Sequence, residues 1–142
     1  MKNLSKLSIA VFLITLLWKD VCAQEAGVQF FKGTWDELVA KAKSEKKPFF
    51  VDVYAVWCGP CKWMSKNTFT NPQVSEYANK NFIAYKIDGE KGEGPKIVQQ
   101  YKVEAYPTIL FFSPEGQLVG SQVGAQEPES FIATMKKFKD KR

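Results

Sequence analysis

The chain of 142 residues contains no histidine and only three cysteines. Without histidine, Ser–His–Asp and Cys–His catalysis are excluded in their usual forms. Attachment of a c-type haem requires a histidine directly after the second cysteine of a Cys-x-x-Cys motif, and Lys62 occupies that position. The chemistry of this protein must therefore come from other side chains.

The small number of cysteines also argues against a metal site. Cys22 lies in an N-terminal segment that is set apart by its composition, which leaves Cys58 and Cys61 for the rest of the chain. A structural zinc site takes four ligands, usually cysteine and histidine, and two thiols cannot supply them. We therefore expect no bound metal.

The chain also lacks an apolar run of comfortable membrane-spanning length. Its N-terminal apolar run, residues 7–18, has twelve residues, whereas a spanning helix needs about 20. Two lysines precede the run, and the Val-x-Ala pattern at residues 21–23 suits a signal-peptide cleavage site. We predict a signal peptide over residues 1–23, cleaved before Gln24, and one domain over residues 24–142.

A cleaved signal peptide implies export, with the periplasm as the expected location. Two alternatives stay open: a membrane tether at the N-terminus and full secretion. The tether would be an uncleaved segment or a lipid on Cys22, although Lys19, Asp20 and Val21 before that cysteine match a lipoprotein signal poorly.

Positive charge is in modest excess. The formal net charge is +5, and removal of residues 1–23 takes away three lysines and one aspartate, which leaves +3. The chain has no basic motif interleaved with aromatic residues and no nucleic-acid fingerprint. We expect no nucleic-acid binding.

Hydrophobic periodicity predicts alternating strands and helices. Five segments have the apolar pattern of strands: residues 28–31, 49–55, 82–88, 108–112 and 117–123. Helices are expected between and after them, with starts near Thr34, Cys58, Asn71, Pro95 and Pro128. The order βαβαβαββα predicts an α/β protein with a mixed central sheet and helices on both faces.

Two of these helix starts have specific capping signals. Thr34 and Glu37 have the spacing of a capping box. Asn71 can cap the helix that restarts after the cysteines, with Pro72 in its first turn.

Cys58 and Cys61 fall where a predicted central strand ends and a helix begins. Free backbone N–H groups and the helix dipole at such a start stabilise a thiolate, so Cys58 is the expected nucleophile. Cys61, one turn deeper, can close a disulfide with it and resolve a mixed disulfide. A purely structural disulfide is the alternative, but so short a loop contributes little stability.

The segments VDVYAVWCGPCK, AYPTILFF and VGA resemble the thioredoxin family, in the family's order and over nearly all of residues 26–140. TFTNPQV is also similar to the C-terminal thioredoxin-like domain of the bacterial transmembrane thiol:disulfide interchange protein. The resemblance implies a thioredoxin fold and a redox-active disulfide between Cys58 and Cys61, with no other cofactor.

The resemblance also implies functions for three further residues. Asp52 matches the buried acid that exchanges a proton with the resolving cysteine, and a carboxylate on a doubly covered strand should have a raised pKa. An aspartate that reaches water at the strand end is the alternative. Lys86 matches a lysine near that acid, although it could be a surface lysine. Pro107 matches the cis-proline that faces the cysteines.

A shallow apolar groove around the dithiol is implied in the same way. Its matching residues are Trp57, Gly59, Pro60, Tyr106, Val123 and Gly124. Simple packing is the alternative for each, most of all for Trp57 and Val123. The sequence departs from the family at Tyr106, where a smaller residue is common, in the GEKGEG loop, and in the missing mid-helix proline of the active-site helix.

These features predict an exported thiol:disulfide oxidoreductase, a monomer that reduces or isomerises disulfides in extracytoplasmic proteins. Its expected partners are protein thiols and disulfides and a membrane-embedded electron donor. Gly59 and Pro60 between the cysteines resemble the reducing members, whereas an oxidising compartment favours the opposite direction. A net oxidase or isomerase and a redox-idle peptide-binding module are the alternatives.

Overall fold

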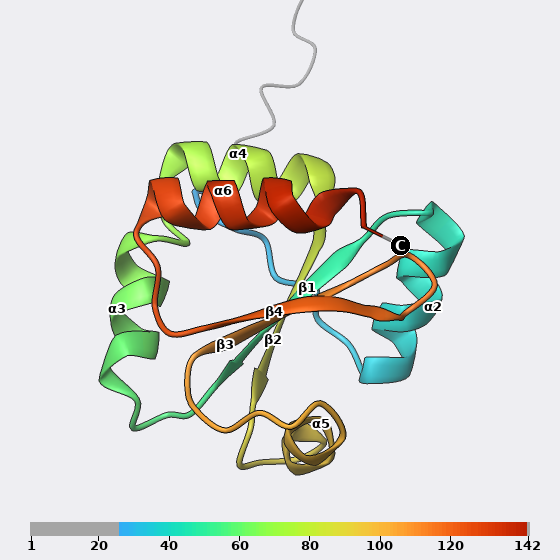
Figure 1. The fold of residues 1–142 in the computed structure, drawn as a ribbon, viewed down its shortest axis with the longest axis horizontal. Helices are drawn as coiled ribbons and strands as arrows, with labels where there is room; N and C mark the ends of the chain where they lie inside the picture. The colour runs from blue at the N-terminus through green and yellow to red at the C-terminus, as the bar shows by residue number, and fades with distance from the viewer. Residues whose placement is uncertain (1–25, 142) are drawn as a thin grey trace, which may run out of the picture.

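The computed structural model describes residues 26–141, which contain a four-stranded mixed sheet flanked by helices (Figure 1). The strands are β1 (Phe49–Tyr54), β2 (Ile83–Asp88), β3 (Thr108–Phe112) and β4 (Leu118–Val123), and their spatial order is β2-β1-β3-β4. β1 pairs with β2 in parallel and with β3 antiparallel, and β3 pairs antiparallel with β4. The predicted mixed α/β sheet is confirmed.

Within residues 26–141, five helices accompany the sheet: α2 (Trp35–Glu45), α3 (Gly59–Asn67), α4 (Pro72–Asn81), α5 (Gly94–Gln100) and α6 (Pro128–Lys139). Apolar residues of α3, α4 and α6 form one core cluster, which includes Phe50 of β1. Apolar residues of α2 and α5 form the second cluster with Phe49, Val51 and Val53. Alternate side chains of β1 thus enter opposite cores, and helices cover both faces as predicted.

The capping signals act as expected. The Thr34 hydroxyl accepts from the Glu37 amide, and the Glu37 carboxylate accepts from the Thr34 amide at 2.8 Å, so α2 starts with a capping box. The Asn71 side chain accepts from the first free amides of α4, and Pro72 lies in its first turn. Side chains close in sequence therefore determine both helix starts.

The predicted first strand, residues 28–31, is wrong. Only an isolated parallel bridge forms there, between Phe30 and Ala84. Other groups take the backbone amides: Val28 N–H donates to the Phe69 carbonyl at 2.8 Å, and Gln29 N–H donates to Asn79 Oδ1 at 2.9 Å. The loop before α4 and α4 itself hold this segment, so it does not form a ladder along β2.

The predicted signal peptide, residues 1–23, and Cys22 lie outside the described residues. Cleavage and lipidation therefore stay predictions. Within residues 26–141, none of the helices combines the length and the apolar character needed to cross a membrane.

Candidate active site

Cys58 and Cys61 lie at the junction of β1 and α3 and form a disulfide, with their Cα atoms 5.3 Å apart. Cys58 is the N-cap of α3, in extended conformation, and Pro60 lies in the first turn. The Cys61 amide donates to Cys58 Sγ at 3.2 Å. The predicted position of Cys58 at a helix N-terminus is confirmed, and a free amide of that terminus is directed at its sulfur.

The two cysteines are almost covered, each with 3% of its surface exposed. Ala55 completes their buried cluster, and Tyr54 and Tyr106 pack against it. The Cys58 amide donates to the Ala55 carbonyl at 3.1 Å, which fixes the turn between β1 and α3. A substrate must therefore reach the sulfur atoms between the side chains that surround them.

Asp52 is buried in the middle of the sheet, 1% exposed, opposite Lys86 on β2 and Ile109 on β3. Its Oδ2 lies 3.3 Å from Lys86 Nζ, an ion-pair distance, but the contact lacks hydrogen-bond geometry. Neither carboxylate oxygen has a hydrogen-bond partner among residues 26–141. Burial raises the pKa of Asp52 from its ordinary 3.8 to about 6, and the Lys86 charge offsets only part of that rise. The alternative of a strand-end aspartate in water is wrong.

Lys86 is not an ordinary surface lysine, since its side chain is only 25% exposed. Its ammonium group donates a hydrogen bond to Ser65 Oγ on α3. It also lies 4.8 Å from the centre of the Tyr54 ring, and the rings of Phe69 and Phe30 follow at 5.6 and 5.7 Å. A hydroxyl and three aromatic faces therefore surround this charge.

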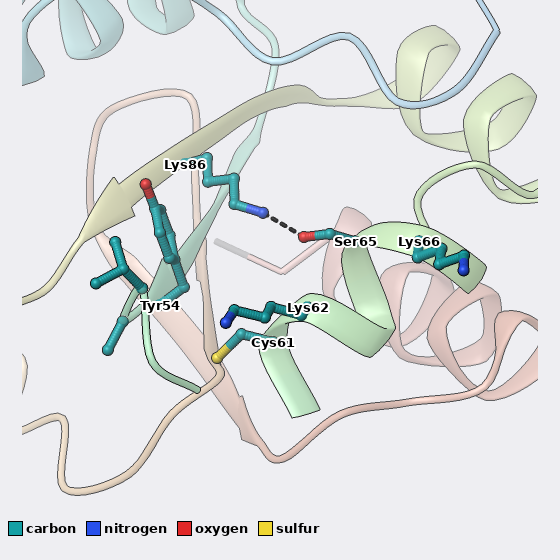
Figure 2. A pocket seen from close by; sticks show the side chains of 8 residues that line it. Tyr54, Cys61, Lys62, Ser65, Lys66 and Lys86 are labelled. Atoms are coloured by element: carbon teal, nitrogen blue, oxygen red, sulfur yellow. Dashed lines mark hydrogen bonds between the residues drawn. The ribbon is translucent and has the colours of Figure 1, made fainter. Parts of the chain in front are cut away.

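A pocket of about 440 Å³ opens between β1, β2 and α3. Figure 2 shows Lys86 reaching from its strand to Ser65 on the helix, with Cys61 and Lys62 one turn earlier on the same helix. The other residues that line the pocket are Tyr54, Ala55, Val56 and Lys66. The pocket thus joins the sulfur of Cys61 to the ammonium group that pairs with Asp52.

Trp57 directly precedes Cys58 and is 65% exposed. Its indole N–H donates to both carboxylate oxygens of Glu90, at 3.1 and 3.0 Å, and its ring meets Tyr106 edge-on at 6.1 Å. Tyr106 in turn lies against Gly89, where an added Cβ would come within 2.5 Å of the tyrosine hydroxyl oxygen. The GEKGEG loop, which departs from the family pattern, therefore positions both aromatic rings.

The peptide bond before Pro107 is cis, as the resemblance implies. The Pro107 carbonyl accepts from the Gly124 amide at 2.8 Å, and Val123 pairs with Thr108 at the start of β3. Val123 is 58% exposed, so like Trp57 it does not merely fill space. Gly59 and Pro60 are exposed in the first turn of α3. Trp57, Gly59 and Pro60 thus adjoin the cysteines in sequence, Tyr106 packs against them, and Val123 and Gly124 lie beside Thr108 and Pro107.

Three residues that contribute to the candidate active site were not predicted from the sequence: Ser65, Tyr54 and Glu90. Ser65 follows Cys61 by four residues, so helical spacing alone places both on one face of α3. Tyr54 is two residues beyond Asp52 on β1 and therefore shares its face of the strand. No local signal marks Glu90, because its contact with Trp57 spans 33 residues of chain.

Among the residues that the structure describes, no group of three potential metal ligands comes together.

Known proteins resemble this chain over most of the described region. The sequence profile of the thioredoxin-like domain family matches residues 35–139. Thioredoxin H5 of Arabidopsis thaliana is 35% identical over 97 residues, which is 67% of this chain and 75% of that protein. The thiol:disulfide interchange protein of Pectobacterium atrosepticum is 33% identical over 102 residues, 70% of this chain but only 18% of that protein.

A solved structure is similar as well. The solution structure of a proposed disulphide-isomerase from Bacteroides thetaiotaomicron superimposes with a TM-score of 0.73 and 37% sequence identity. The match covers 84% of this chain and 98% of that one. Sequence profile, relatives and fold agree with the disulfide at the start of α3: the chain belongs to the thioredoxin-like family and is a disulfide oxidoreductase whose redox pair is Cys58 and Cys61.

Proposed function

We propose that this protein is an exported thiol:disulfide oxidoreductase that reduces or isomerises disulfides in extracytoplasmic proteins, with Cys58 as the attacking thiol and Cys61 as the resolving thiol. The main support is the Cys61 amide, which is directed at Cys58 Sγ at the start of α3. In the reduced protein the same amide favours the thiolate of Cys58 over its thiol, because it stabilises negative charge on that sulfur.

The reaction begins when the Cys58 thiolate attacks one sulfur of a substrate disulfide. A bond forms between Cys58 and that sulfur, the substrate S–S bond breaks, and the second substrate sulfur leaves as a thiolate. Cys61, once deprotonated, attacks Cys58 Sγ, which releases the first substrate sulfur and closes the Cys58–Cys61 disulfide. Two electrons pass to the substrate, and an external dithiol must return them.

Asp52 is the proposed acceptor of the Cys61 proton. Its carboxylate is buried without a hydrogen-bond partner among the described residues, and burial raises its pKa to about 6. A base with a pKa close to the operating pH can both take and return a proton. Water that enters the pocket beside Cys61 and Lys86 would carry the proton between the thiol, the carboxylate and the solvent.

Substrate binding is assigned to the exposed residues around the disulfide. Trp57 and Val123 offer apolar surface, and Gly59 and Pro60 leave the first turn of α3 open to a partner. Beyond its chain neighbours and the backbone of its own helix, no atom of residues 26–141 lies within 4 Å of the position that a Cβ would take at Gly59, which leaves room for an approaching chain. Extended protein segments that contain a disulfide are the substrates that fit this surface.

Export rests on the signal-peptide pattern of residues 1–23, and a membrane-embedded donor would supply electrons there. The Gly59–Pro60 dipeptide between the cysteines resembles that of the reducing members of the family, and this favours reduction. The potentials of reducing members are about −270 mV, against about −120 mV for strong oxidants. Isomerisation is the second candidate, supported by the 37% identity to the proposed disulphide-isomerase from Bacteroides thetaiotaomicron.

Reduction of insulin by the protein with a dithiol donor tests this proposal. We expect turnover above the rate of the donor alone, and the lack of turnover would favour a binding module over an enzyme. Equilibration of the Cys58–Cys61 dithiol with glutathione buffers then measures its reduction potential, which distinguishes a reductase from an isomerase or oxidase. A potential above about −180 mV, the range of isomerases, would contradict the reductase assignment.

A further inference from the structure

Among the described residues, the Lys86 ammonium group contacts two polar side chains, Ser65 and Asp52, and is hydrogen-bonded only to the first. It donates to Ser65 Oγ, whereas its contact with Asp52 Oδ2 is an ion pair at 3.3 Å without hydrogen-bond geometry. An ammonium group ordinarily prefers a carboxylate to a hydroxyl, because the carboxylate adds the attraction of an opposite charge to the hydrogen bond. The position of Ser65 on α3 therefore directs a proton of Lys86 away from Asp52.

Three aromatic rings restrict where this ammonium group can go. Tyr54, Phe69 and Phe30 lie within 4.8 to 5.7 Å of Nζ, and they come from β1, the loop after α3 and the N-terminal bridge. Attraction to these rings keeps the charge between the sheet and α3. Without the Ser65 hydroxyl, Asp52 Oδ2 would be the nearest strong acceptor inside this enclosure.

The charged surroundings of Asp52 are otherwise simple. Lys86 is the charge that faces it from β2, and Ile109 faces it from β3. The remaining titratable groups near the pocket are Cys61, Lys62 and Lys66 from α3, Tyr54 from β1 and Asp88 from β2. Lys62 and Lys66 are exposed to solvent, so after burial itself the Lys86 ammonium group has the largest effect on the pKa of that carboxylate.

We propose that Ser65 is a positioning residue: by accepting a hydrogen bond from Lys86, it limits the pairing of that lysine with Asp52 and keeps the carboxylate a strong enough base to take the proton of Cys61. The effect on Cys61 rests on the proposed function; the effect on Lys86 and Asp52 does not. Ser65 itself touches neither substrate nor sulfur in this scheme, and it acts through Lys86.

The Ser65→Ala variant frees the ammonium group to bond directly to Asp52. The pKa of Asp52 should then fall by about one unit or more, since a close opposite charge stabilises the carboxylate. A weaker base accepts the Cys61 proton less readily, so resolution of a mixed disulfide at neutral pH should slow by about threefold. The midpoint at which the rate of resolution falls on the acid side should move to lower pH together with the pKa of Asp52.

Two measurements on the full domain test this. Carboxyl ¹³C titration by NMR follows Asp52 in the oxidised protein, and stopped-flow release of a thiol from a preformed Cys58 mixed disulfide follows resolution against pH. Ser65→Thr retains the hydroxyl and should restore both profiles. Ser75→Ala, which removes a buried helix hydroxyl that donates to the Pro72 carbonyl, should change neither.

A double variant isolates the route through the lysine. In a Lys86→Met background, Ser65→Ala should leave the titration of Asp52 unchanged, whereas a shift that persists would contradict the proposal. An unchanged or raised pKa of Asp52 in the single variant, or no recovery with threonine, would overturn it as well. If the wild-type protein does not reduce insulin, the proposed function is contradicted, but the proposal for Ser65 is not, because the titration of Asp52 is measured without turnover.

Discussion

The two halves of strand β1 differ in what they bury. The first half places Phe49 and Phe50 into opposite cores, where Phe49 stacks on Phe112 with ring centres 4.6 Å apart and Phe50 meets Phe131 edge-on at 5.5 Å. The second half buries the Asp52 carboxylate and leads through Ala55 to the disulfide. Both halves are largely buried, but only the second contains groups that can react.

This difference separates stability from reactivity within six residues. Close-packed aromatic rings lower the free energy of the folded state through burial and dispersion. A buried carboxylate without a hydrogen-bond partner raises the free energy of the folded state whenever it is charged. The apolar half of β1 therefore stabilises a fold that tolerates the cost of the reactive half.

The largest effect is expected at the disulfide itself. Cys58→Ala removes the attacking thiol, so insulin reduction should fall to the background of the dithiol donor. Cys61→Ala is the matched variant, which should still attack but accumulate mixed disulfides because nothing resolves them. Non-reducing gels and mass spectrometry of captured partners read the outcome. Capture by neither variant, or equal capture by both, would contradict the assigned order of attack.

In the apolar half, Phe49→Ala should lower the free energy of unfolding by about 3–5 kcal/mol, because it removes a fully buried ring from a close-packed core. Urea unfolding of the oxidised protein measures this. Leu118→Ala on β4, where the side chain is exposed, should cost much less. The alkylation rate of Cys58 in the reduced folded protein should not change, and a marked change would show that the two halves are coupled.

Asp52→Asn should raise the free energy of unfolding, whereas Phe49→Ala lowers it. The pKa of Asp52 is raised from 3.8 to about 6, so the folded protein binds a proton that the unfolded chain releases, and stability falls as pH rises through that window. At about 1.4 kcal/mol per unit, the variant should gain about 3 kcal/mol at pH 7 and almost nothing near pH 3.5. Urea unfolding across this range measures the gain.

The same substitution should slow resolution of a mixed disulfide, most strongly near neutral pH, because asparagine cannot accept a proton. A variant that is more stable at pH 7 and equally fast would assign Asp52 a purely structural cost. A variant without the pH-dependent gain would show that the carboxylate is solvated in the folded protein.

The smallest effect is expected outside the buried strand. Glu90→Gln keeps a partner for the Trp57 indole but removes the charge, and both groups are exposed. The free energy of unfolding should change by less than about 0.5 kcal/mol, as is usual for surface substitutions. A larger loss in urea unfolding would show that the contact between the loop and Trp57 stabilises the fold as well as the groove.

The success of the sequence predictions depended on distance along the chain. The capping box of Thr34 and Glu37, the start of α4 at Pro72 and the position of Cys58 before α3 were all predicted, because each depends on residues within one helical turn. Residues 28–31 were predicted as a strand from an apolar pattern that is correct locally. Their amides bond instead to Phe69 and Asn79, which no local pattern could show.

The redox pair is thus a property of a short stretch of chain, since a strand that ends where a helix begins aims a backbone amide at Cys58 without help from distant residues. The basicity of Asp52 is not. It depends first on burial in the sheet and then on the Lys86 ammonium group, which lies among Ser65, Tyr54 and two phenylalanine rings from separate elements. Electrostatic interactions in a buried site are set by distances in space, and only the tertiary fold brings those groups together.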